Sequence, residues 1–209
     1  MKKLRSIAVL AAAAFMLTPL FSTTNAQAST EDEFPLRLTN TTNQTQVNKN
    51  VSAYNISDIT RNEHFDKNNL SYYITPGTAI GVQRDIRAGA LTWNMATKVK
   101  FTETKTKNSA DIVFTNNGTT SAENGLTTNT INRSRGYIEV LSSKIDLSKN
   151  TIPQTTLSTM GKRVVEHELG HALGLKDSYS DQNGTIMWYK TPNTDVTPKD
   201  VQAINVYYK

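Results

Sequence analysis

The stretch His167-Glu168-Leu169-Gly170-His171-Ala172-Leu173-Gly174-Leu175-Lys176-Asp177 holds two histidines four residues apart, and a glutamate directly follows the first. On a helix, residues i and i+4 lie one above the other on the same face, so the two imidazoles can bind one zinc ion. The carboxylate of Glu168 points to the neighbouring side, where it can take a proton from a zinc-bound water. The pattern predicts a zinc-dependent hydrolase.

Two residues beyond the second histidine extend this motif. Gly174 lets the chain leave the helix sharply, because the left-handed backbone conformation costs glycine little. That turn can bring Asp177 back to the metal as a third ligand, with the fourth position open for water. The alternative is that Asp177 is a surface carboxylate and water completes the site. H-E-x-x-H alone also arises by chance, but this chain has only three histidines among 209 residues.

The first 28 residues have the pattern of a secretory signal peptide. A basic start (Lys2, Lys3 and Arg5) precedes an apolar run at 7–17, and Ala26-Gln27-Ala28 offers small residues for cleavage. The run is short for a membrane span and no stop-transfer segment follows, so an uncleaved anchor is the weaker interpretation. We expect a secreted, extracellular protein. The signal and the absence of cysteine favour a bacterial, Gram-positive exporter.

The composition narrows the class of protein further. Because there is no cysteine, neither a disulfide nor a thiolate ligand can form. About 180 residues would remain after cleavage, enough for one domain with a hydrophobic core. The formal charge of +5 would fall to +2, because three of the 23 Lys and Arg precede residue 29 and none of the 18 Asp and Glu does. We therefore expect a monomer with no preference for nucleic acid or membranes.

The expected mature chain divides into an extension and a folded domain. Residues 29–69 are rich in Thr and Asn and poor in periodic apolar residues, which indicates a linker, a pro-segment or a loosely packed extension. Strands are expected at 70–74, 99–104, 111–115, 126–131 and 136–141. Helices are expected at 80–95, at 157–173 and from Thr197-Pro198 onward. Strands grouped between helices predict an α+β fold.

The motif, the order of elements and a downstream methionine resemble the metzincin zinc metalloproteases, and within them the matrixin-like branch. Thr185-Ile186-Met187 stands where metzincins have a Met-turn beneath the zinc. Aspartate as third ligand, in place of the usual histidine, is similar to the secreted bacterial snapalysin-type proteases. The resemblance covers residues 70–209. It implies a twisted mixed sheet of four to five strands, three main helices, and zinc bound by His167, His171 and Asp177 at the end of the second helix.

The resemblance also implies an activity, a secreted zinc endopeptidase acting on extended peptides or proteins. Glu168 would be the general base towards a metal-activated water, and the strand at 126–131 would pair with the substrate. In astacin- and serralysin-type metzincins, a tyrosine two positions after the methionine can stabilise the oxyanion. Tyr189 has that offset, and the alternative is that it packs beneath the Met-turn.

Three further possibilities stay open. Calcium is a second candidate ion, for which Asp181, Asn183 and the Asn116-Asn117-Gly118 loop offer oxygen ligands, although ordinary turns explain them equally well. His64 and Asp66 are candidates for a latency ligand in the 29–69 segment, with solvated side chains as the alternative. The rival to an enzyme is a non-catalytic, secreted zinc-binding or adhesive protein. Glu168 argues against it, because structural zinc sites need no general base.

Overall fold

The structure, a computed structural model, describes residues 54–117, 124–133, 136–179, 184–188 and 190–209. These residues lie in one compact unit, Lys49–Lys209. Its helices are α1 (Ile80–Ala96), α2 (Thr159–Ala172) and α3 (Pro198–Asn205), together with a short 3-10 turn at Lys107–Ser109. Its strands are β1 (Glu63–His64), β2 (Asn69–Ile74), β3 (Lys100–Glu103), β4 (Ile112–Thr115), β5 (Gly125–Asn132) and β6 (Ile138–Leu147). Within these ranges, no helix has the length and apolar composition needed to cross a bilayer.

The sheet is mixed, and among the described strands one pairing is antiparallel. Strands β3, β2, β4 and β6 pair in parallel in that order, and β1 adds a short parallel pair to β6. Strand β5 runs antiparallel to β6, from the Gly125–Leu147 pair to the Asn132–Glu139 pair. Among the described strands, β6 is the only partner of β5, so β5 forms an edge. The predicted α+β fold with a mixed sheet and three main helices is confirmed.

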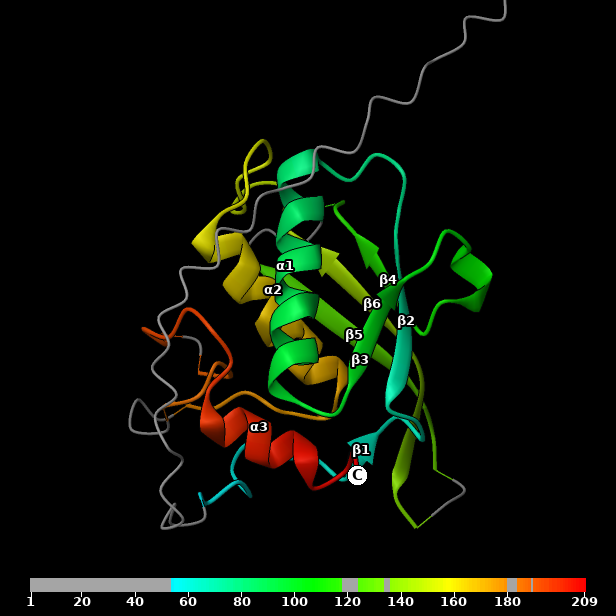
Figure 1. Ribbon diagram of the computed structural model, residues 1–209, viewed down its shortest axis with the longest axis vertical. Coiled ribbons are helices and arrows are strands. Elements are labelled where there is room, and N and C mark those ends of the chain that lie inside the picture. Colours follow the sequence, from blue (N-terminus) through cyan, green and yellow to red (C-terminus); the bar gives the residue numbers. More distant parts are fainter. Residues whose placement is uncertain (1–53, 118–123, 134–135, 180–183, 189) are drawn as a thin grey trace, which may run out of the picture. The chain divides into compact units, whose positions relative to one another are not determined.

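Helices α1 and α2 pack together on one side of the sheet (Figure 1). They approach closely at Gly89, where an added Cβ would lie 2.7 Å from the Val165 side chain. Trp93, which is fully buried, donates from Nε1 to the carbonyl of Glu166 at 3.0 Å. Ile80, the first residue of α1, is half exposed. The buried face of α1 includes Val82, Ile86, Ala90 and Trp93. The packing of α1 against α2 at Gly89 and Trp93 fixes the position of α2, which carries the metal-binding motif.

Residues 54–69 belong to the same compact unit. Ile59 and Phe65 are buried in the core, and Lys199 of α3 forms an ion pair with Asp58, with 2.9 Å between Nζ and Oδ2. The expected boundary at residue 69 thus runs through packed structure. Few apolar side chains anchor this segment, which is why its composition resembles that of a loose extension. Residues 29–53 lie outside the described part of the chain.

The first turn of α3 holds the Thr185-Ile186 segment, which borders the site, in place. Thr197 caps the helix and Asp200 completes a capping box, with Pro198 at the first position as predicted. The fully buried Asp200 carboxylate also accepts from the Ile186 N–H at 3.0 Å and from the Thr185 hydroxyl. Two turns that are distant in sequence therefore share one buried carboxylate.

The packing of residues 54–69 predicts how far the N-terminus can be shortened. A chain that starts at Lys49 keeps every residue that the structure describes, as does the chain from Ser29, so both should be folded. A chain that starts at Leu70 loses Ile59 and Phe65, at about 1.5–3 kcal/mol for each buried side chain, so it should unfold at a much lower temperature. Circular dichroism during heating measures this. Equal melting temperatures for all three chains would contradict the placement of residues 54–69 in the core.

Candidate metal centre

The two histidines of α2 present their Nε2 atoms to the same space. The rings of His167 and His171 lie edge to face, with 4.6 Å between centroids and an interplanar angle of 89°. The Nδ1 atoms lie 3.0 Å from the carbonyl oxygen of Ile186 and 3.1 Å from that of Leu175, respectively. Because a carbonyl can only accept, each Nδ1 carries the proton and each Nε2 keeps a free lone pair. Both rings are thus in the tautomer that binds a metal through Nε2.

The turn after α2 depends on Gly174, as predicted. Its φ is 103°, a backbone conformation that residues other than glycine rarely adopt. An added Cβ would lie 1.8 Å from the carbonyl oxygen of Glu63, so no other residue fits there. The Leu175 N–H bonds back to Gly170 O at 2.9 Å and ends the helix. The chain then returns along the histidine face, which carries Asp177 towards the two imidazoles.

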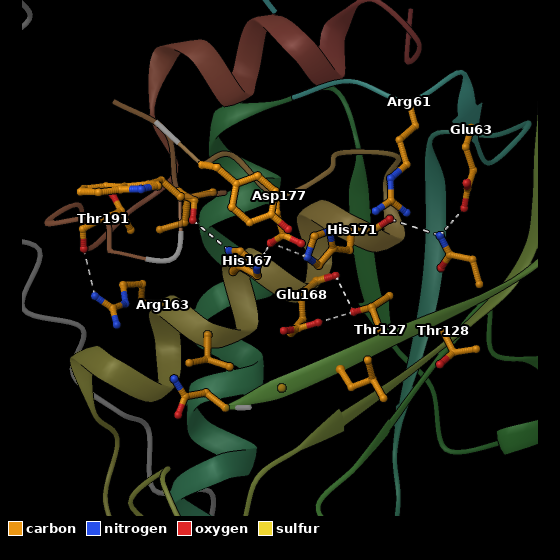
Figure 2. A pocket seen from close by; sticks show the side chains of 18 of the residues that line it. Arg61, Glu63, Thr127, Thr128, Arg163, His167, Glu168, His171, Asp177 and Thr191 are labelled. Atoms are coloured by element: carbon orange, nitrogen blue, oxygen red, sulfur yellow. Dashed lines mark hydrogen bonds and ion pairs between the residues drawn. The ribbon is translucent and has the colours of Figure 1, made fainter. Parts of the chain in front are cut away.

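Asp177 completes a set of three donor atoms (Figure 2). Its Oδ1 lies 3.1 Å from Nε2 of His167 and 3.4 Å from Nε2 of His171. Zinc bonds of about 2.1 Å at tetrahedral angles separate neighbouring ligand atoms by roughly 3.4 Å. Both distances from Asp177 are close to this spacing, and all three donor atoms lie within 4.8 Å of one another, so one zinc ion can reach them all. The described residues contain no second group of this kind.

The charges at the centre favour a cation. When Nε2 of His167 and His171 carries a proton as well, hydrogen bonds from both rings hold the pKa of the Asp177 carboxyl far below its usual range. Burial lowers the pKa of His167, but the hydrogen bond to Asp177 and the charge of Glu168 outweigh it and raise that pKa above its ordinary value. A proton on His167 would compete with the metal, so zinc affinity is expected to fall as the pH falls.

Met187 forms the floor of the centre. It is fully buried, and an added Cβ at Gly170 would lie 2.5 Å from its Sδ, so the sulfur packs beneath α2 between the two histidine turns. The Met187 carbonyl accepts from the Ser178 N–H at 2.9 Å. This is the position expected for a Met-turn. Tyr189 lies outside the described residues, so its two suggested roles stay predictions.

Three of the five residues suggested for calcium, Asp181, Asn183 and Gly118, also lie outside the described residues. Asn116 is described and is buried. Its Nδ2 donates to the carbonyl of Leu147 at 3.1 Å, which is a structural role. Calcium stays a prediction.

Glu168 borders a cleft of about 790 Å³ between α2, β5 and the segment after Asp177. Only 5% of the Glu168 residue is exposed. The other lining residues are Arg61, Glu63, Asn124, Gly125, Leu126, Thr127, Thr128, Asn129, Ile131, Arg163, Val164, His167, His171, Asp177, Tyr179, Ile186, Trp188 and Thr191. The strand expected at 126–131 therefore forms one wall of this cleft.

Several of these residues were not predicted from the sequence. Asn129 Nδ2 donates to His171 O at 3.2 Å and to Glu63 Oε1 at 2.7 Å. Arg163 Nη1 donates to Thr191 O at 3.0 Å at another part of the wall. The period-two alternation of β5 could have placed Asn129 on the side that faces the helix. Nothing in the sequence could have paired that strand with α2.

The geometry predicts that Asp177 is a ligand and that water does not take its place. Asp177→Asn keeps the shape but removes the charge, so zinc affinity should fall roughly 100-fold or more. Competition with a chromogenic chelator measures this. Asp195→Asn, an exposed carboxylate paired with Lys162 away from the cleft, is the control and should bind zinc like the wild type. Unchanged affinity in Asp177→Asn would support the surface-carboxylate alternative.

A comparison with known protein families covers most of the folded domain. The family model for matrixin matches residues 64–209, which is more than half of the chain. A comparison with curated proteins gives no match. Matrixins bind zinc and hydrolyse peptide bonds, and the matched residues contain the motif, the turn at Gly174 and the methionine floor. The chain therefore belongs to the matrixin family of zinc metalloproteases.

Proposed function

We propose that this protein is a secreted zinc endopeptidase in which His167, His171 and Asp177 hold the metal and Glu168 is the general base. The observation that carries the proposal is the convergence of two Nε2 atoms and one Oδ1 at the spacing of a tetrahedral zinc site. Zinc bound there would polarise the scissile carbonyl and lower the pKa of its water towards about 7.

In this mechanism Glu168 moves the proton. Its carboxylate accepts a proton from the attacking water and delivers it to the leaving amine, acting first as base and then as acid. Because Glu168 is almost fully buried, bulk solvent has little access to its carboxylate. Strand β5 supports the same role, because Gly125 leaves open a space where a Cβ would lie 2.7 Å from Glu168 Oε1. A non-catalytic zinc protein would have no need for this carboxylate beside the metal.

The substrate in this proposal is an extended peptide that pairs with the free edge of β5. Residues Asn124 to Asn129 line the cleft next to Glu168, so a strand added there would pass the general base. Backbone pairing of this kind gives affinity with little sequence preference. Export through the signal at residues 1–28 belongs to the same proposal, since an extracellular protease meets protein substrates outside the cell.

Hydrolysis of casein or a quenched peptide, with and without a zinc chelator, tests the function. The chain from Ser29 should cleave in a chelator-sensitive manner and contain about one zinc per chain. If zinc is bound but neither the chain from Ser29 nor the chain from Lys49 cleaves, the non-catalytic alternative is favoured.

A single substitution separates the chemical step from metal binding. Glu168→Gln keeps the size of the side chain but removes its proton affinity, so kcat should fall by roughly 10³-fold or more while zinc stays bound. Glu103→Gln, an exposed carboxylate paired with Arg87, is the matched control and should be fully active. Wild-type cleavage by Glu168→Gln would rule out this mechanism.

A further inference from the structure

Strand β5 touches the motif helix through one face only. Its odd-numbered residues from 125 to 129 are partly buried, whereas Leu126, Thr128 and Thr130 are exposed. Strand geometry puts alternate residues on opposite faces. The inner face meets α2 at the general base and again one turn later, where Asn129 bonds to His171 O.

Thr127 contacts the general base directly (Figure 2). Its Oγ1 lies 2.6 Å from Glu168 Oε2 and 3.0 Å from the Glu168 carbonyl oxygen. A threonine hydroxyl has one proton, and the shorter contact is the one to the carboxylate. A hydrogen bond to an ionised acceptor is shorter and stronger than one to a neutral acceptor, so the hydroxyl donates to the carboxylate.

Gly125 lies against the same Glu168 side chain and leaves no room for a larger residue at its own position. It is two residues before Thr127, so both lie on the inner face of β5. A Cβ at Gly125 would lie 2.7 Å from Oε1, 2.8 Å from Cγ and 2.9 Å from Cδ of Glu168. The backbone of Gly125 is not left-handed, so the requirement for glycine here comes from the Glu168 side chain.

We propose that Thr127 is a positioning residue, which fixes the Glu168 carboxylate from the strand that binds the substrate, and that Gly125 leaves the space for it. The proposal rests on the proposed function of Glu168 as general base. Substrate that pairs with β5 would then be held by the same backbone that orients the base. A base held in one orientation loses less entropy on reaching the transition state, so the effect falls on kcat.

Three variants test this role in the chain from Ser29. Thr127→Val removes the hydroxyl at nearly constant volume, Thr127→Ser retains it, and Thr102→Val removes an exposed hydroxyl from β3, away from the cleft. For each variant, kcat and KM are measured separately with a quenched peptide. Zinc content and melting temperature are measured alongside, and a crystal structure shows where the Glu168 carboxylate lies.

The expected result is a loss specific to kcat. Thr127→Val should lower kcat roughly 10- to 100-fold and change KM by less than about threefold, with zinc retained and the Glu168 carboxylate displaced. Thr127→Ser should restore most of kcat, and Thr102→Val should match the wild type. Gly125→Ala, an independent variant, should also lower kcat with zinc retained, because its methyl group displaces the carboxylate.

The contrary results are equally specific. Wild-type kcat in both Thr127→Val and Gly125→Ala overturns the proposal, as does a loss in Thr127→Val that serine does not restore. If Thr127→Val loses zinc or unfolds, Gly125→Ala becomes the deciding variant. Wild-type kcat in Gly125→Ala then counts against the proposal. A failure of the proposed function is distinct, because the wild type and Thr102→Val would then cleave nothing.

Discussion

The hydrogen bonds from the two imidazoles to backbone carbonyls are the interaction on which the site depends. They fix the tautomer and the direction of each Nε2, and each carbonyl is held by a different part of the fold. Leu175 O is placed by the turn at Gly174. Ile186 O is placed through Asp200, whose carboxylate accepts from the N–H of the same residue. The arrangement of the donor atoms that would hold zinc is therefore a result of tertiary structure as well as of helix spacing.

The segment before β1 supports the first of these carbonyls. Arg61 N–H donates to Gly174 O at 2.9 Å, and Lys176 N–H donates to Ile59 O at 2.9 Å. Backbone hydrogen bonds to residues 59–61 thus hold the chain on both sides of Leu175. Leu175 lies two residues before Asp177, the third ligand. The Lys199–Asp58 ion pair and the buried Ile59 attach this segment to the rest of the unit. A pro-segment whose removal leaves the site intact would have to end before these residues.

Local patterns in the sequence singled out three side chains that the structure brings together, His167, His171 and Asp177. The histidine spacing, Gly174 and Thr197-Pro198 are patterns of a few residues that helix and turn geometry explain, whereas Met187, which packs against Gly170, was indicated by the family resemblance. The roles of Thr127, Asn129 and Asp200 depend on which strand or turn packs against α2, and no local pattern carries that information. Strand β1 has two residues and no periodicity to detect. The length of β6 was underestimated for a similar reason, because Ser142, Ser143 and Lys144 hide the alternation that the pairing with β4 and β5 imposes.

Anomalous X-ray diffraction at the zinc absorption edge, from crystals of the chain grown with zinc, tests the central claim most directly. The account predicts one strong peak bonded to Nε2 of His167, Nε2 of His171 and a carboxylate oxygen of Asp177, at about 2.0–2.2 Å. The remaining position should hold water beside Glu168. A peak elsewhere, or a fourth protein ligand that closes the site, would contradict the assignment of this centre to catalysis.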